Sequence, residues 1–191
     1  MTENDLIKRA KGGDKDAIAW LVSQYSERIY NLALRILRNK EDAEDVLQET
    51  FLTVLRKLET FDGRSNFFTW IYRIATNASL MKLRKKKLLF TELPDNPDLR
   101  YAPGDRMLVD WSQDPSLNVQ NKEIKKILEG AINELSDIYR SVFILRDIEQ
   151  LSIRETSKIL NLSEENVKIR LRRARLFLRD KISKQFEENP V

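Results

Sequence analysis

The chain has 191 residues, of which 41% are hydrophobic, enough apolar material for one or two modest folded domains. It contains no Cys and no His, which excludes disulfides and thiolate metal sites and removes the commonest proton shuttle and metal ligand. Most enzyme mechanisms are therefore disfavoured, and no cofactor is expected. The 34 Lys and Arg barely outnumber the 30 Asp and Glu, so basic residues matter through local clustering.

No segment is typical of export or of a membrane span. The first residues, MTENDLIKRAKGGD, contain no apolar core of signal-peptide type, and no uncharged run reaches membrane-spanning length. The absence of Cys also fits a reducing compartment. These features predict a cytoplasmic protein without membrane insertion.

Helical periodicity predicts an all-α fold that begins with a four-helix domain. Residues 4–87 are free of proline, and the pattern breaks only where turn residues gather, at Gly12-Gly13, around Asn39 and around Asp62-Gly63. The predicted helices can close a bundle, and they cover residues 5–11, 16–38, 42–58 and 66–86. We take residues 1–87 as the first domain.

The composition changes after residue 87. Residues 88–120 hold four of the five prolines and six acids against two arginines, so they carry a local charge of about −4 and should not form a regular helix. They are predicted to be a flexible acidic linker. Helical periodicity resumes at residue 121, so residues 121–191 form a second small helical domain. No β pattern of useful length is visible.

The second domain contains the pattern of a helix-turn-helix. Ser152 can cap a short helix in a reciprocal pair with Glu155, and Asn161 tolerates the left-handed backbone needed to leave that helix. Ser163 can cap the next helix, residues 163–181. Apolar residues recur there every three or four positions and should face the core, namely Val167, Leu171, Ala174 and Leu178.

The opposite face of this helix is basic. Residues 168–175 hold five cations and no acid. The core register directs four side chains outward, and these are candidates for groove contact: Lys168, Ile169, Arg172 and Arg173. An ordinary solvated basic face is the alternative, but the agreement of cap, turn and register favours DNA binding.

An acidic cluster lies in the predicted helix 42–58. Residues 41–49, EDAEDVLQE, contain five acids and no base. The buried stripe of this helix should consist of Ala43, Val46, Leu47, Phe51, Val54, Leu55 and Leu58. The outward face then exposes Asp45, Gln48, Glu49 and the otherwise unexplained Leu52. Such a face either serves only solubility, which charge alone favours, or docks a basic protein partner.

Aromatic residues gather at 61–72, FDGRSNFFTWIY, ahead of a cationic run at 82–87. Phe67 and Trp70 continue an apolar stripe and are assigned to the core. The side chains left near the Gly63 turn are Phe61, Phe68, Tyr72 and Asn77. Aromatic faces beside cations are typical of surfaces that bind single-stranded DNA. The alternative is that all five aromatics of this segment pack in the core.

Both domains resemble regions of the bacterial RNA polymerase sigma factors of the sigma-70 family. The first resembles the core-binding and promoter-melting region over DAEDVLQETFLTVLRKLETFDGRSNFFTWIYRIATNASLMKLRKKK. The second resembles the promoter-binding fourth region over LSDIYRSVFILRDIEQLSIRETSKILNLSEENVKIRLRRARLFLRDKI. The short length, without a third domain between these two, is similar to the extracytoplasmic-function (ECF, group IV) type.

The resemblance implies a role for each cluster of the first domain. The acidic helix falls where the family docks on the clamp helices of the polymerase's largest subunit, so docking is expected through Asp42, Asp45, Gln48 and Glu49. The loop 61–66 and the helix through Asn77 match the part that captures a flipped base of the minus-ten element. The expected pocket residues are Phe61 and Asn77, with Phe68 and Tyr72 beside them. The adjoining backbone would be held by Lys82, Arg84, Lys85, Lys86 and Lys87.

In the second domain the resemblance implies recognition of the minus-thirty-five element. The expected reading residues are Lys168, Ile169, Arg172 and Arg173, and phosphate contacts are expected from Ser163, Arg170 and Arg175. Ile169 cannot hydrogen-bond a base edge, so it should contact a thymine methyl or nothing. Thr156 and Ser157 depart from a usually more apolar helix, which should loosen the fold slightly. The acidic linker is expected to run through the polymerase cleft toward the RNA exit path.

The expected function is that of a dissociable initiation subunit, with core RNA polymerase and promoter DNA as partners and an anti-sigma factor that clamps between the two domains. One alternative is a stand-alone helix-turn-helix regulator, which leaves the acidic and aromatic clusters unused. Another is a sigma-like antagonist that sequesters an anti-sigma protein and should carry a receiver domain. A metal-dependent nuclease would need carboxylates from several elements, and one helix cannot provide them.

Overall fold

In the computed structural model, residues 2–90 and 122–188 are described, and their side chains over 2–86 and 127–184. All regular structure in these described ranges is helical, which confirms the all-α prediction. The chain divides into two compact units, Met1–Lys82 and Leu83–Val191, and each is described by itself. The domain limits at residues 87 and 121 stay predictions. Residues 91–120 of the predicted linker lie outside the described residues.

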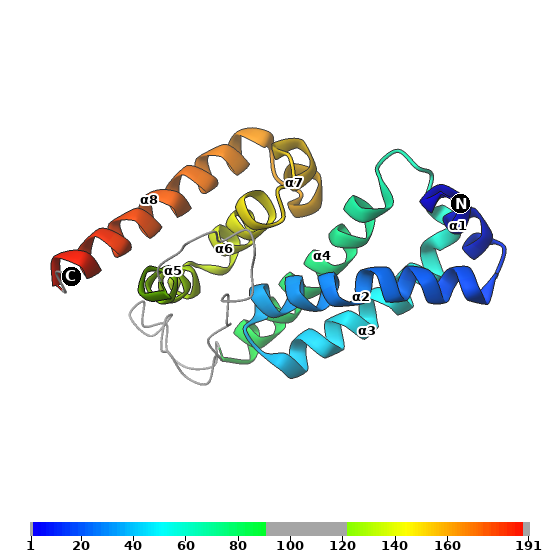
Figure 1. The fold of residues 1–191 in the computed structure, drawn as a ribbon, viewed down its shortest axis with the longest axis horizontal. Coiled ribbons are helices and arrows are strands. Elements are labelled where there is room, and N and C mark those ends of the chain that lie inside the picture. Colours follow the sequence, from blue (N-terminus) through cyan, green and yellow to red (C-terminus); the bar gives the residue numbers. More distant parts are fainter. Residues whose placement is uncertain (1, 91–121, 189–191) are drawn as a thin grey trace. The chain divides into compact units, whose positions relative to one another are not determined.

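The first unit contains three of the four predicted helices and most of the fourth (Figure 1). They are α1 (Glu3–Lys11), α2 (Lys15–Leu37), α3 (Lys40–Lys57) and α4 (Phe67–Phe90), with a short 3₁₀ turn η1 (Leu58–Thr60) after α3. The long helix α2 packs against both α1 and α3, and α2 and α3 lie side by side (Figure 1). The predicted break after residue 86 is wrong, since α4 continues to Phe90. The first proline of the segment is Pro94, and Leu88, Leu89 and Phe90 are compatible with a helix.

The turns between these helices come from residues that accept backbone hydrogen bonds. The Asp14 carboxylate accepts from the first turn of α2, and the Asn39 side chain accepts from the Asp42 N–H at 2.9 Å to begin α3. Asn66 accepts from the Thr69 N–H at 2.8 Å to begin α4. Gly63 has φ of +74°, which glycine adopts without strain. The loop 61–66 is therefore specified at both ends by local chemistry.

The core of the first unit lies between the apolar stripes of α2, α3 and α4. Its fully buried side chains include Ile29, Leu32, Ile36, Val46 and Ile71. One predicted core residue is wrong: Leu55 is 45% exposed. The inward positions of α3 are Val46, Thr50, Val54 and Leu58, and this spacing turns Leu55 toward solvent.

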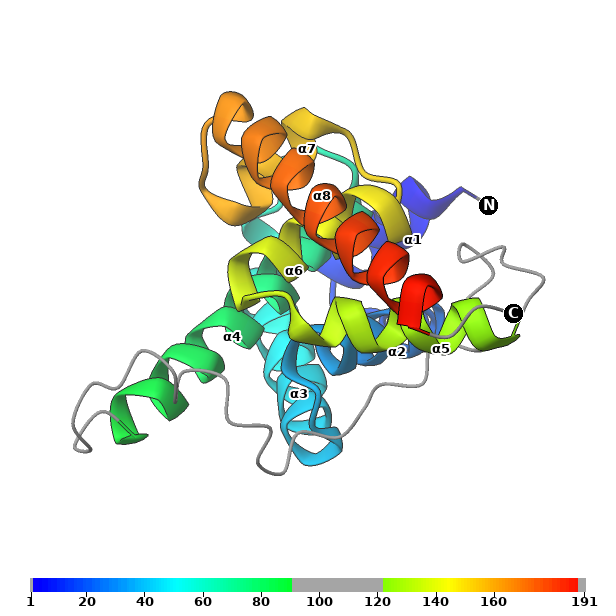
Figure 2. The same ribbon diagram turned by 90° about the vertical axis from the view of Figure 1, so that its left-hand side faces the viewer.

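The second unit is arranged around one long helix. Its elements are α5 (Lys122–Glu134), α6 (Asp137–Phe143), the π-helical turn η3 (Ile144–Ile148), α7 (Ile153–Leu160) and α8 (Glu164–Glu188). Each of α5, α6 and α7 packs against α8 (Figure 2). The core register of α8 is confirmed, because Val167, Leu171, Ala174 and Leu178 are buried.

The predicted helix-turn-helix chemistry is confirmed. Ser152 and Glu155 form the reciprocal capping pair at the start of α7. Asn161 ends α7 with φ of 52° and ψ of 49°, the left-handed conformation. Ser163 accepts from the Asn166 N–H at 3.2 Å to begin α8, and Ser157 donates to the Leu162 carbonyl at 2.8 Å across the turn. Short-range hydrogen bonds therefore set the angle at which α8 leaves α7.

Candidate functional site

The acidic surface of α3 is formed by Asp45, Gln48 and Glu49, which are exposed as predicted. Leu52 and Leu55, 60% and 45% exposed, add apolar area to the same helix. An acidic rim with apolar side chains fits a protein partner better than it fits nucleic acid, because phosphates repel carboxylates.

Asp42 does not belong to that exposed surface. It is 7% exposed, and its carboxylate lies 3.3 Å from the Lys82 ammonium of α4. Asp42 precedes the buried Val46 by four positions, so it lies on the inward face of α3. Asp42 was expected to dock the polymerase together with the exposed acids, but in this structure it connects two helices of the first unit.

Lys82 is the third member of this ion cluster. Its ammonium also donates to the Asp45 carboxylate at 2.5 Å. Burial of Lys82 opposes its charge, but the hydrogen bonds to Asp45 and Asp42 outweigh this effect and raise the Lys82 pKa. Lys82 was predicted to hold the DNA backbone, and in this structure its charge is compensated by α3.

Two of the predicted base-pocket residues are buried. Tyr72 is fully buried and Phe61 is 7% exposed, so neither presents a free ring face to a base. The Phe61 ring contacts Phe67 at a centroid distance of 5.5 Å and Trp70 at 5.2 Å. The expectation of free rings is wrong for this pair, because packing against aromatic side chains of α4 stabilises the unit more than exposure would.

The remaining residues of that surface are more accessible. Phe68 is half-buried, with Tyr72 on its ring at 4.0 Å and Arg28 of α2 at 5.9 Å. Asn77 is exposed, as are Arg84, Lys85 and Lys86 farther along α4. Lys87 belongs to α4, and its side chain lies outside the described residues.

The loop adds polar groups that the sequence did not indicate. Asp62 accepts from the Arg64 N–H at 3.0 Å and pairs with the Arg64 guanidinium, whose side chain is 90% exposed. Lys11 of α1 contacts Phe61, and Arg28 of α2 contacts Phe68. Helical periodicity cannot show that residues this far apart in sequence are in contact. For Arg64, the only signal in the sequence is its position next to the Asp62-Gly63 turn.

The recognition face of α8 is exposed as predicted. Lys168, Arg172 and Arg173 point away from the core, and Ile169 is 40% exposed. The Arg173 guanidinium lies 3.4 Å from the Tyr139 hydroxyl. Arg170 is half-buried, and the Ser163 hydroxyl is occupied as the helix cap. A helix with this arrangement can enter the major groove of DNA.

Arg175 differs from the cations around it. Its guanidinium forms a bidentate pair with Asp147 of η3, at 2.8 and 2.6 Å. Hydrogen bonding to Asp147 outweighs partial burial and raises the Arg175 pKa. The predicted phosphate contact is therefore not available while the pair is intact, and Arg175 instead connects α8 to the π-helical turn.

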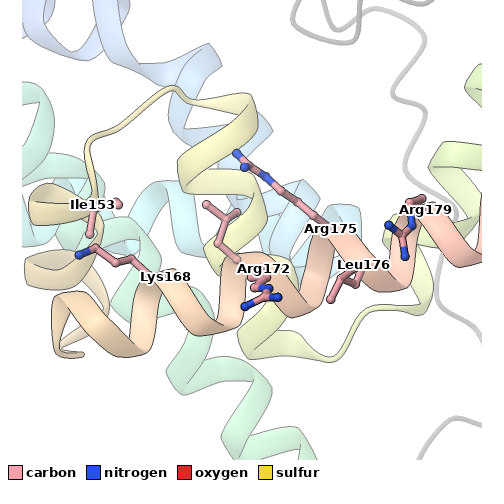
Figure 3. Close-up of a pocket in the computed structure, with 7 residues that line it drawn as sticks. Ile153, Lys168, Arg172, Arg175, Leu176 and Arg179 are labelled. Carbon is pink, nitrogen blue, oxygen red and sulfur yellow. The ribbon is translucent and has the colours of Figure 1, made fainter.

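A shallow groove of about 390 Å³ runs along α8 (Figure 3). Its apolar floor consists of Ile153, Leu171 and Leu176, and its rim carries Lys168, Arg172, Arg175 and Arg179. In Figure 3 Lys168 lies next to Ile153, and Arg175 points away from α8. Because Arg175 is paired with Asp147, the charge open to an extended anion such as a nucleic-acid backbone comes from Lys168, Arg172 and Arg179.

Within residues 2–90 and 122–188, no helix is long and apolar enough to cross a membrane. No group of three or more acidic, Cys or His side chains lies close enough to hold a metal ion in the described ranges.

These elements define a class of protein. One unit contains a helix-turn-helix with a basic recognition helix, and the other exposes an acidic face. This combination is typical of a DNA-binding transcription factor that also binds a protein partner. Residues 21–88 match the family model of sigma-70 region 2, and residues 125–178 match that of sigma-70 region 4.

Two sigma factors are similar in sequence to this chain over nearly its whole length. The ECF RNA polymerase sigma factor SigW of Bacillus subtilis is 37% identical over 182 residues, which cover 92% of this chain and 94% of SigW. The ECF RNA polymerase sigma-E factor of Haemophilus influenzae is 30% identical and covers 95% and 96%. The chain belongs to the sigma-70 family of RNA polymerase sigma factors, in its ECF group. It is a transcription initiation factor, and its family is non-enzymatic.

Solved structures show the same fold at low sequence identity. The sigma factor RpoE from Bartonella quintana, solved with the anti-sigma factor NepR, has a TM-score of 0.67 and 21% identity, covering 86% of this chain and 96% of RpoE. CnrH, solved with the cytosolic domain of CnrY, has a TM-score of 0.62 and 21% identity, covering 98% of each chain.

Proposed function

We propose that this chain binds core RNA polymerase, directs it to specific promoters and assists melting of the duplex. The main observation in support of this proposal is that the two units of this sigma-70 chain expose surfaces of opposite charge. One unit exposes the acidic surface of α3, and the other exposes the basic face of α8. The polymerase supplies the catalysis, and the chain acts in the cytoplasm without an enzymatic activity of its own.

The polymerase docks on α3 through Asp45, Gln48 and Glu49. Their exposure and charge suit the clamp helices of the polymerase's largest subunit. Leu52 and Leu55 lie farther along the same helix and supply apolar contact area. Asp42 acts indirectly, because its pairing with Lys82 holds α3 against α4.

The minus-ten strand binds on the loop 62–66 and the exposed side of α4. Asn77 supplies polar contacts to the edge of a flipped base, and Phe68 supplies a partly exposed ring. Arg84, Lys85, Lys86 and Lys87 hold the adjoining backbone. Phe61 and Tyr72 act as the packed support beneath this surface.

The minus-thirty-five element is read in the major groove by α8. Lys168, Arg172 and Arg173 contact base edges or phosphates, and Ile169 contacts a thymine methyl. The groove beside Ile153 follows the phosphate backbone, with Ser163 and Arg170 near the start of the helix.

An anti-sigma factor is the second protein partner. RpoE of similar fold was solved with the anti-sigma factor NepR, which supports the same kind of inhibitor for this chain. Such a partner competes with the polymerase for the acidic and apolar surface of α3, because one surface cannot serve both at once.

The test is reconstituted transcription with purified core polymerase and genomic promoter fragments. We expect the full chain to bind core polymerase and to produce transcripts from a defined subset of start sites. A chain that binds promoter DNA without polymerase and represses it would be a stand-alone regulator. A chain that binds only an anti-sigma protein and never directs initiation would be an antagonist, and either result refutes the proposal.

A further inference from the structure

Helix α1 contacts η1 and Phe61, the residue at which the loop to α4 begins, although α1 lies ahead of the residues matched by the region 2 model. Lys11, its last residue, donates from Nζ to the Phe61 carbonyl at 2.5 Å across 50 positions of sequence. The same ammonium lies 5.7 Å from the centre of the Phe61 ring. One side chain of α1 thus holds both the backbone and the ring of Phe61.

The Phe61 carbonyl lies directly ahead of the Asp62-Gly63 turn and accepts from Lys11. The Phe61 N–H donates to the Leu58 carbonyl at 3.1 Å and so ends η1, and Gly63 follows with its positive φ. A partly buried carbonyl outside a helix needs a donor from elsewhere in the fold. Lys11 supplies that donor with a charge, which makes the bond stronger than a neutral one.

Helix α1 also reaches the far end of the loop through Tyr25 of α2. The Tyr25 hydroxyl donates to the Glu3 carboxylate of α1, and its ring contacts Phe67 at 5.4 Å. Phe67 is the first residue of α4 and packs edge-on against Phe61. Helix α1 is therefore connected to both ends of the loop 62–66. The contact with Phe61 is direct, and the connection to Phe67 is made through Tyr25.

We propose that Lys11 is a positioning residue for the minus-ten strand. By holding the Phe61 carbonyl it sets the path of the loop 62–66, and so the place where a flipped base meets the loop and Asn77. This inference rests on the proposed function, which assigns the minus-ten strand to this surface. Lys11 itself does not touch DNA, because its ammonium is occupied by Phe61.

The test compares four full-length variants in complex with core polymerase. Lys11→Met removes the donor at nearly constant size, Lys11→Gln keeps a donor without charge, and Lys11→Arg keeps both. Lys8→Met, exposed one turn earlier on α1, is the matched control. The probes are single-stranded minus-ten oligonucleotides from a promoter that the wild type uses, with each base in turn at the captured position.

We expect Lys11→Met to lose about fivefold in affinity for the preferred base, the size of one lost hydrogen bond, and to discriminate less between bases. Lys11→Arg should restore discrimination, Lys11→Gln should restore part of it, and Lys8→Met should match the wild type. Affinity for core polymerase and for minus-thirty-five duplex should not change. Hydrogen exchange of the loop amides should be faster in Lys11→Met.

Three results would overturn the inference. If Lys11→Met discriminates between bases as well as the wild type does, the positioning role is rejected and the proposed function is unaffected. A parallel loss of thermal stability, core binding and strand binding, found in both Lys11→Met and Lys11→Gln, makes Lys11 a general stabiliser. A wild-type holoenzyme without any base preference on single strands rejects the minus-ten assignment itself, and the role of Lys11 with it.

Discussion

Lys82 of α4 lies between two carboxylates of α3, 2.5 Å from Asp45 and 3.3 Å from Asp42. The Asp42 side chain is 11% exposed and that of Asp45 is 68% exposed, so one ammonium pairs with a buried and a solvated acid. The two acids are three positions apart in the same predicted acidic cluster, but they differ in their exposure to solvent. Asp42 stabilises the fold, and Asp45 remains accessible to a partner.

Stability measurements should separate these two acids. Asp42→Asn should lower the free energy of unfolding by about 1 to 2 kcal/mol, because Lys82 loses its buried partner and the start of α3 loses a negative charge. Asp45→Asn should cost about 0.5 kcal/mol or less, as for other exposed pairs. Thermal unfolding of the full chain, with Glu44→Gln as an exposed control, checks this. Equal losses for both acids would contradict the assignment of separate roles.

Charge reversal on the acidic surface should weaken polymerase binding. Asp45→Lys combined with Glu49→Lys should reduce the affinity for core polymerase about tenfold or more at low salt, because attraction to a basic partner becomes repulsion. The circular dichroism of the isolated chain should not change. Glu27→Lys, exposed on α2, is the control for a general charge effect. Unchanged affinity in a binding titration would remove α3 from the docking surface.

Asn77 should contribute to single-stranded binding alone. Its side chain is exposed on α4 and is assigned to the edge of a flipped base, so Asn77→Ala should cost roughly 1 to 2 kcal/mol in binding to a minus-ten strand by holoenzyme. Binding of duplex minus-thirty-five DNA should be unaffected, because α8 lies in the other unit. Fluorescence anisotropy with both probes measures the two effects, and the opposite order of sensitivity would refute the minus-ten surface.

Arg173 and Arg175 should behave differently although both lie on α8. Arg173→Ala should cost about 1 to 3 kcal/mol at one promoter position if it reads a base, as measured with a set of single-base promoter variants. An equal loss on every sequence would make Arg173 a phosphate contact. Arg175→Ala should leave base preference unchanged and lower stability by about 1 kcal/mol or less, because it loses its pair with Asp147.

Removal of one buried hydroxyl should stabilise the helix-turn-helix. Thr156 of α7 is fully buried, and its hydroxyl finds no hydrogen-bond partner among the described residues. Thr156→Val keeps the shape and removes the unpaired group, so it should raise stability by about 1 kcal/mol. Ser157→Ala, which loses the bond to the Leu162 carbonyl, should have the opposite sign. A destabilised Thr156→Val in thermal unfolding would show that the hydroxyl is satisfied in solution.

Local chemistry was readable from the sequence because it acts over a few residues. The Ser152 and Glu155 pair, the left-handed Asn161 and the Ser163 cap depend only on spacings of up to four positions. The outward position of Lys168, Ile169, Arg172 and Arg173 follows from the 3.6-residue period of one helix. For the same reason the all-α fold and the helix limits of the first unit were predicted to within a few residues.

The sequence did not indicate contacts in which a side chain meets another part of the fold. Phe61 and Tyr72 were left outside the core because helical periodicity cannot show that a loop aromatic or a second side of α4 is buried. Lys82 and Arg175 were expected at phosphates, but each pairs with an acid of a different element, Asp45 and Asp147 respectively. A cluster of charges in the sequence does not show which residue of another element each charge will pair with.

The order of residues alone determined that the chain is helical, which side chains cap α7 and α8, and which face of α8 is basic, because hydrogen bonds and periodicity act along one helix. Only the tertiary structure decided which acids and aromatics stay accessible. Burial and ion pairing depend on which helices pack together, as in the contacts of Lys11 with Phe61 and of Asp42 with Lys82. Those contacts join residues far apart in sequence, and no local pattern records them.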